Sequence, residues 1–153
     1  MKKIVHGSVK IPVALALLVA IVAIAASAIY VREANALRRG VSEGFRLDGV
    51  YRDHEPGLTS LSFHGEDGSR WQIVDSIGNA TDGSFETTDD PNIFMLADKS
   101  GDEYGFAHLS YVSADGNQGS LYLNTGTSVI EFDKVSRDPA FVESSTCRYF
   151  YFL

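Results

Sequence analysis

The chain has 153 residues, of which 44% are hydrophobic and 22% charged, and these values exclude a wholly disordered protein. The formal charge is −7, and residues 1–31 hold three lysines and no acid, so residues 32–153 carry −10. A domain that acidic repels phosphate backbones and anionic lipid surfaces, so we expect no nucleic-acid partner and no electrostatic docking on charged membranes.

The first element is an uncharged, mostly aliphatic run over residues 11–31, preceded by residues 1–10. As a helix this run is ~31 Å long, close to the hydrocarbon thickness of a bilayer. A domain of this size has no core to bury it on every side, so the run predicts a transmembrane or signal helix. Small-x-small patterns at 26–28 and 34–36 keep cleavage open, but the run exceeds the ~7–15 residues of a signal core. We therefore expect a retained anchor.

The charges that flank the run give little indication of its orientation in the membrane. Basic residues lie on both sides, so the numbers of positive charges that the positive-inside rule compares are nearly equal. We expect residues 1–10 in the cytoplasm, since the C-terminal part then is an ordinary exported module of the cell membrane. If the N-terminal segment is cleaved, the domain is secreted. Residues 32–44, with Gly40 and Gly44, are predicted to form a polar tether that is helical near the membrane.

Short alternating runs begin at about residue 45. Leu61 and Phe63 alternate with polar neighbours, and Trp71 and Ile73 flank Gln72. Period-two alternation buries one face of a strand and leaves the other in water, so Trp71 is expected inside and Gln72 in solvent. The pattern predicts eight strands, over residues 49–53, 58–64, 70–75, 83–87, 92–98, 103–112, 119–124 and 128–135.

Turn residues separate these strands at short intervals. Gly, Asp and Asn gather at residues 65–68, 100–102, 114–117 and 124–126, where each group can supply the positive φ of a tight hairpin. Short links make sequential strands antiparallel. We therefore predict an all-β fold, a small antiparallel up-and-down barrel of about eight strands over residues 45–143, because closure removes exposed edges.

Six short motifs punctuate this region: Gly49-Val50-Tyr51, Leu61-Ser62-Phe63, Asp67-Gly68 before Trp71-Gln72-Ile73, Gly83-Ser84-Phe85, Gly119-Ser120-Leu121 and Phe132-Asp133-Lys134. Between residues 47 and 143 they resemble the lipocalin-like, calycin-type domains of small bacterial cell-envelope proteins. The first strand departs from the lipocalin pattern, which has Gly-x-Trp where this chain has Gly49-Val50-Tyr51. The resemblance implies a calycin-type barrel and leaves the activity open.

Residue types that build metal or catalytic sites do not converge in the sequence. The histidines beyond the N-terminal segment are His54, His64 and His108, no cysteine pattern accompanies them, and alternation places His108 in solvent. Acidic residues surround the turn at 98–103 but form no twelve-residue calcium loop. No Gly-x-Ser-x-Gly elbow or phosphate loop is present. We therefore expect that the protein is not an enzyme and that it has neither a cofactor nor a metal site.

Three aromatic residues are predicted to lie on the outer face: Tyr104, Phe106 and Tyr122. By alternation they oppose the inward residues of the same two strands. Aromatic side chains that gather on a surface mark contact sites, so these three form the candidate contact surface.

The apolar C-terminal tail, residues 144–153, contains Cys147, which is the only cysteine. A single cysteine excludes an internal disulfide, so the domain depends on its core for stability. The aromatic residues of the tail are expected to cap the barrel or pack on its membrane-proximal side.

Taken together, the sequence predicts a membrane-anchored, extracytoplasmic, non-enzymatic module that binds a small apolar ligand or a protein partner. One alternative is a structural or accessory subunit of a membrane complex with a filled barrel core. Large inward residues such as Phe63, Tyr111 and Phe132 favour a filled interior, because eight strands enclose little spare space. The other alternative is a cleaved and secreted β-domain.

Overall fold

The computed structural model describes residues 11–53, 59–65 and 68–143, with side chains from Val13 onward. The predictions for residues 1–10, His54 and the tail with Cys147 lie outside the described residues. The chain forms two compact units, one that ends at Asn35 and one that begins at Ala36.

A single α-helix, α1 (Ile11–Glu43), contains the apolar run. Every described side chain from Val13 to Val31 is exposed within the chain. By length and composition this helix can cross a membrane, a test that a signal sequence also passes. The predicted N-terminal apolar helix is therefore confirmed.

The helix continues through residues 32–43, most of the stretch that the sequence analysis assigns to a tether. Arg, Ala and Glu predominate there and favour helix. The helix ends where Gly44 adopts a φ of +97° and donates its N–H to the Gly40 carbonyl at 3.0 Å, which is a left-handed C-cap. Residues 36–43 of this helix belong to the second unit.

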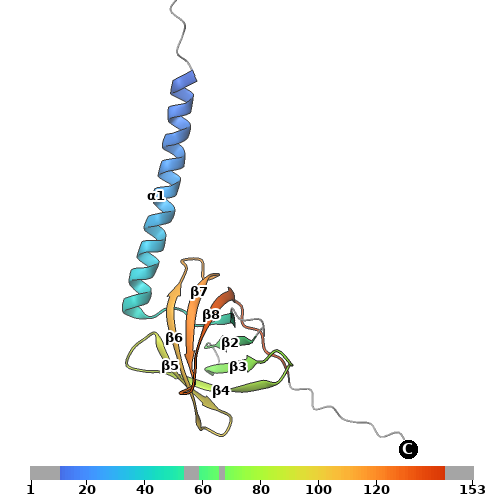
Figure 1. The fold of residues 1–153 in the computed structure, drawn as a ribbon. Helices are drawn as coiled ribbons and strands as arrows, with labels where there is room; N and C mark the ends of the chain where they lie inside the picture. Colours follow the sequence, from blue (N-terminus) through green and yellow to red (C-terminus); the bar gives the residue numbers. More distant parts are fainter. Residues whose placement is uncertain (1–10, 54–58, 66–67, 144–153) are drawn as a thin grey trace, which may run out of the picture. The chain divides into compact units, whose positions relative to one another are not determined.

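The second unit is a closed antiparallel barrel in which every strand pairs with its neighbours in sequence and the first pairs with the last (Figure 1). This confirms the predicted eight-stranded, up-and-down fold, with strand ends that differ by at most three residues from the predicted ones. The strands are β1 (Gly49–Asp53), β2 (Ser60–His64), β3 (Arg70–Val74), β4 (Ala80–Thr87), β5 (Ile93–Asp98), β6 (Glu103–Val112), β7 (Gly119–Asn124) and β8 (Val129–Ser136).

Large side chains fill the interior of the barrel. Tyr51, Phe63, Trp71 and Phe132 are each 0% exposed, as is Leu61. Phe63 makes edge-to-face ring contacts with Tyr51 at 5.9 Å and with Phe85 at 5.6 Å, a geometry that aromatic pairs prefer. The barrel therefore has a packed core rather than an open cup.

Two β-bulges in β6 break the alternation that the sequence analysis assumes. The register with β5 shifts between Leu96 and Ala97, and the register with β7 shifts between Leu109 and Tyr111. Tyr111, predicted to point inward, is only half-buried and lies 6.5 Å from the Phe45 ring, while Val112 takes the core position. Because a bulge adds one residue to a strand, the residues beyond it that alternation would place inward point outward, and the reverse.

The outer face of β3 is covered by a distant segment of the chain. Gln72 is only 2% exposed: its amide donates to the Val142 carbonyl at 2.9 Å and accepts from the Val142 N–H. Beside it, the Arg70 guanidinium stacks on Phe141 at 4.4 Å. The prediction that Gln72 lies in solvent was wrong, because residues 141–143 return across this strand after β8.

Gln72→Ala is therefore expected to lower the free energy of unfolding by about 1–2 kcal/mol, since it removes both hydrogen bonds and leaves the Val142 backbone groups unpaired. Chemical denaturation of the full chain in detergent measures the change. The matched control is Glu86→Ala, which truncates an exposed, outward residue of β4. Equal stabilities of the two variants would contradict the contact.

Candidate functional site

The outer face of the barrel carries two of the three predicted aromatic residues. Phe106 is 38% exposed and lies directly across from Met95, which is 37% exposed. Tyr122 pairs with His108, which lies two residues beyond Phe106 on β6, and the rings of Tyr122 and His108 are 6.5 Å apart. The Tyr122 hydroxyl donates to Glu131 at 3.0 Å, and this contact raises the pKa of Tyr122. Phe106 and Tyr122 therefore share one face, and sequence analysis missed Met95 as their neighbour.

Tyr104 does not share this face. Its ring centroid lies 4.5 Å from that of Trp71, it packs against the core, and burial raises its pKa. The outward placement of Tyr104 was wrong because the bulge between Leu96 and Ala97 makes Tyr104 the extra residue of β6. The proposed aromatic surface is thus reduced to Phe106 and Tyr122, with Met95 added.

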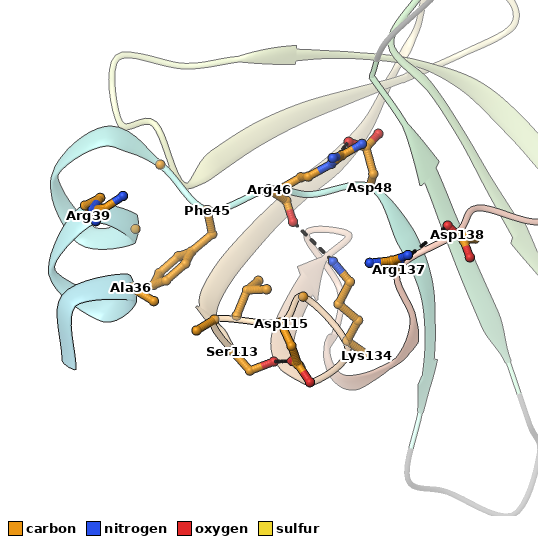
Figure 2. Close-up of a pocket in the computed structure, with 15 residues that line it drawn as sticks. Ala36, Arg39, Phe45, Arg46, Asp48, Ser113, Asp115, Lys134, Arg137 and Asp138 are labelled. Atoms are coloured by element: carbon orange, nitrogen blue, oxygen red, sulfur yellow. Dashed lines mark hydrogen bonds and ion pairs between the residues drawn. The ribbon is translucent and has the colours of Figure 1, made fainter. Parts of the chain in front are cut away.

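A pocket of about 590 Å³ lies at the end of the barrel where β1 and β7 begin and β6 and β8 end (Figure 2). Its wall combines the last turns of α1, the stretch that leads into β1, the β6–β7 turn and the end of β8. We call it the end pocket. Its lining residues are Ala36, Arg39, Gly40, Gly44, Phe45, Arg46, Asp48, Val112, Ser113, Ala114, Asp115, Gly116, Lys134, Arg137 and Asp138.

One side of the end pocket is fixed by Asn92, which lies between β4 and β5. The Asn92 amide donates to the Gly40 carbonyl at 3.0 Å and accepts from the Phe45 N–H at 2.8 Å. Gly40 is buried against Phe45, and a Cβ at Gly40 would overlap the phenyl ring. With glycine at this position the Phe45 ring packs directly against the helix, so the helix end and Phe45 form one wall.

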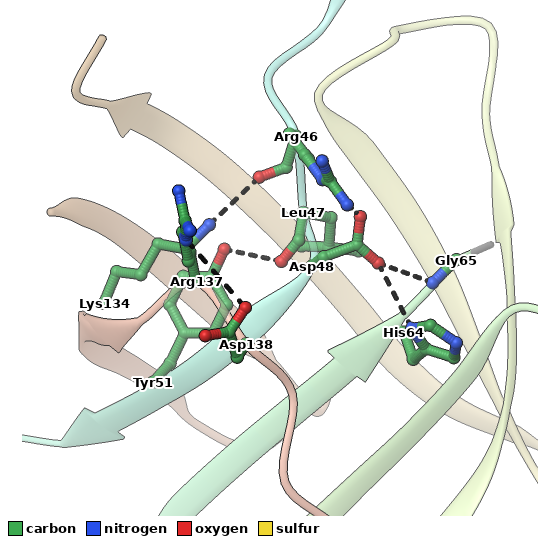
Figure 3. Close-up of polar contacts among 9 residues, drawn as sticks. All are labelled: Arg46, Leu47, Asp48, Tyr51, His64, Gly65, Lys134, Arg137 and Asp138. Atoms are coloured by element: carbon green, nitrogen blue, oxygen red, sulfur yellow. Dashed lines mark hydrogen bonds and ion pairs between the residues drawn. The ribbon is translucent and has the colours of Figure 1, made fainter. Parts of the chain in front are cut away.

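A polar cluster around Asp48 lies beside the pocket (Figure 3). Asp48 accepts from Arg46 Nε at 2.8 Å and from the Gly65 N–H at 2.6 Å, with His64 Nδ1 at 3.8 Å. Burial raises the pKa of Asp48, but these donors outweigh it and the pKa lies below its usual value. Asp48 is therefore held as a carboxylate.

Lys134 is the most unusual residue of the end pocket. It is only 5% exposed, and its ammonium donates to the Arg46 carbonyl at 3.2 Å and lies 5.3 Å from the Tyr51 ring centroid. It forms no ion pair with any described carboxylate. Burial lowers the pKa of Lys134 to about 8, although the charge of Asp48 opposes the shift.

The stability of the protein is expected to rise between about pH 8 and pH 10.5 because of Lys134. In that window the unfolded chain keeps a proton on this lysine that the folded chain releases, so a higher pH favours the folded state. Below pH 8 the lysine is charged in both states and its effect is constant. Lys134→Met should remove this rise, roughly 3 kcal/mol, and stabilise the protein at pH 7.

Denaturant titrations over pH 7–10.5 measure the effect as the difference between wild type and variant, which cancels the titration of the tyrosines. Lys99→Met is the control, since the Lys99 side chain is 70% exposed. If the free energies of unfolding of Lys134→Met and wild type changed in parallel with pH, the burial of the charge would be refuted.

Lys134 was not predicted as a site residue, although the sequence holds a signal for it. Ile130 and Phe132 are inward residues of β8, and Lys134 continues their period of two. A lysine in an inward series is unusual and marks a position that needs a polar partner. The other lining residues come from segments distant in sequence, and nothing in the sequence brings them together.

The residues considered for metal binding do not form a site in the part of the chain that the structure describes. No group of three or more His, Cys, Asp or Glu side chains gathers there. Asp98 accepts from the backbone N–H groups of Ser100 at 2.7 Å and Asp102 at 3.1 Å, so this acidic cluster caps its own turn. His108 is exposed, as alternation predicts.

No protein-family model matches the chain, and neither does any curated protein or solved structure. The class of protein is therefore defined by the fold: a closed eight-stranded antiparallel β-barrel behind one N-terminal apolar helix. Its two candidate sites are the end pocket and the outer face around Phe106.

Proposed function

We propose that the chain is a membrane-anchored, extracytoplasmic, non-enzymatic module with a lipocalin-like barrel, and that it binds its partner on the outside of that barrel. The observation that carries this proposal is the filled interior. Trp71, Phe63 and Phe132 are each 0% exposed, and an eight-stranded barrel has little further space. A small apolar ligand inside the barrel is thus disfavoured, and a protein partner is favoured.

The outer face supplies the contact residues for such a partner. Phe106 and Met95 lie side by side on adjacent strands and expose more than a third of their surface. Tyr122 extends the surface on β7 and offers a hydroxyl group, an amphipathic character that suits interfaces. The filled interior equally supports an accessory subunit of a membrane complex, in which α1 would pack against other transmembrane helices.

Membrane anchoring is tested by protease treatment of intact spheroplasts that contain the full chain. We expect digestion of the barrel and survival of a membrane-bound N-terminal fragment. Full protection of the barrel would reverse the orientation, and release from the membrane without protease would show cleavage of the N-terminal segment.

Partner binding is tested with a photo-crosslinking amino acid at position 106 in the same cells. We expect one discrete protein adduct, which Met95→Glu should abolish because it places a charge within the contact. The matched control has the crosslinker at Ile77, which is 82% exposed in the β3–β4 turn. Equal adducts at both positions would contradict a specific surface.

A further inference from the structure

We infer that the end pocket binds the phosphate of a zwitterionic phospholipid headgroup through the Lys134 ammonium and the Arg39 guanidinium. The lipid as the source of the phosphate rests on the proposed membrane anchoring, whereas the phosphate site itself does not.

The domain is acidic, but the lining of the end pocket has more cationic than acidic side chains. Residues 32–153 carry −10, yet four cationic and three acidic side chains line the end pocket. Two of the acids have partners of their own. Asp48 is held by Arg46 and Gly65, and Asp115 accepts from the Ser113 hydroxyl at 2.6 Å, which lowers the pKa of Asp115 to about 2. The lining thus holds one more cationic than acidic side chain, and Lys134 is the buried one among the cations.

Lys134 supplies the strongest evidence for an anionic ligand. An ammonium group has three N–H donors, and among the described residues Lys134 uses one of them, on the Arg46 carbonyl (Figure 2). A buried charge without a paired opposite charge is costly, so the fold places this side chain at a site where an anion can reach it. Phosphate oxygens accept several hydrogen bonds and suit both an ammonium and a guanidinium.

Chain connectivity keeps Ala36, one of the lining residues, close in sequence to the end of the uncharged run. Ala36 follows Val31, the last residue of the uncharged run, by five positions, so the two lie at most ~18 Å apart. Headgroups extend a bilayer from ~30 Å to ~40–45 Å in total thickness, which places them within this reach. Phe45 and Ala36 add an apolar wall for the glycerol portion of a lipid.

A zwitterionic headgroup fits better than an anionic one. The acidic domain is repelled by an anionic surface, whereas a zwitterionic membrane has no net charge to repel it. Asp138, whose side chain is 87% exposed and 3.9 Å from Arg137, lies on the rim of the pocket and offers a carboxylate to the amine of the headgroup. The mixed signs of the lining thus match a ligand that carries both charges.

The test uses the full chain in a phosphate-free maltoside detergent, with glycerophosphoethanolamine as the probe. Binding to the folded state alone raises the melting temperature with probe concentration, and we expect a rise of several degrees at saturation. Lys99→Gln, which removes an exposed lysine elsewhere on the barrel, should retain the rise. Lys134→Met should abolish it. Arg39→Gln, at an exposed position that leaves folding intact, should reduce it severalfold.

Several results would overturn the inference. Absence of any rise with wild type, or an unchanged rise in Lys134→Met, would show that the pocket holds no phosphate. A larger rise with inorganic phosphate would assign the site to a free anion instead of a lipid. An equal rise with ethanolamine alone would assign binding to the acidic rim. Because the probe is soluble, these results do not depend on membrane anchoring, which the protease experiment tests separately.

Discussion

Trp71→Ala is expected to destabilise the barrel by roughly 3–5 kcal/mol, the usual cost of truncating a fully buried large aromatic residue. Trp71 is 0% exposed, its ring packs 4.5 Å from that of Tyr104, and its indole N–H donates to the Ala97 carbonyl at 2.9 Å. A domain of this size has only about 5–15 kcal/mol of total stability. The variant should therefore melt at a much lower temperature or fail to fold.

Two measurements separate the contributions of Trp71. Trp71→Phe retains most of the buried volume and loses the hydrogen bond, so we expect a smaller loss of about 1–2 kcal/mol. Trp71 is the only tryptophan, and its native emission should be blue-shifted and move to the red on unfolding. Emission typical of solvated indole in the native state, with a harmless Trp71→Ala, would show that Trp71 points outward.

Gly83→Val is expected to destabilise the barrel by on the order of 3 kcal/mol, because it forces two strands apart. Gly83 of β4 lies opposite Trp71, and a Cβ at Gly83 would overlap the Ala97 carbonyl of β5. That carbonyl also accepts the indole N–H, so its displacement weakens the contact of Trp71 as well. The two effects act on the same part of the core.

Melting of the full chain and the emission of Trp71 together test this prediction. The emission of Gly83→Val should move to the red in the native state, because the strands that the side chain forces apart admit water to the indole. Gly65→Ala is the matched control, since the nearest atom to a Cβ there is 3.5 Å away and the backbone is not strained. A wild-type emission spectrum in Gly83→Val would indicate that β4 has room for a side chain.

Most of the fold could be predicted because alternation and turn chemistry are local properties of the sequence. Phe63, Trp71 and Phe132 were all expected inside, and all three are fully buried. Alternation fails where one strand gains a residue, as at Tyr104, because a bulge depends on how two strands pair and not on the order of side chains in one strand.

The candidate sites were much less predictable than the fold. The partner of Gln72 is 70 residues away, and no local pattern indicates such a contact. The end pocket likewise combines a helix end, a turn and the last strand, which meet only after the barrel has closed. Phe106 and Tyr122 could be placed on one face because adjacent strands joined by a short turn fix their register.

Closure of the barrel by β1 and β8 has a consequence for the synthesis of the protein. Val50, near the start of the domain, pairs with Ser136, near its end. One edge of β1 therefore remains unpaired until β8 has been made, and an unpaired edge invites association with other strands. A nascent chain that stops before Val129 has two open edges, β1 and β7. A helper that shields strand edges is consequently most needed just before the last strand arrives.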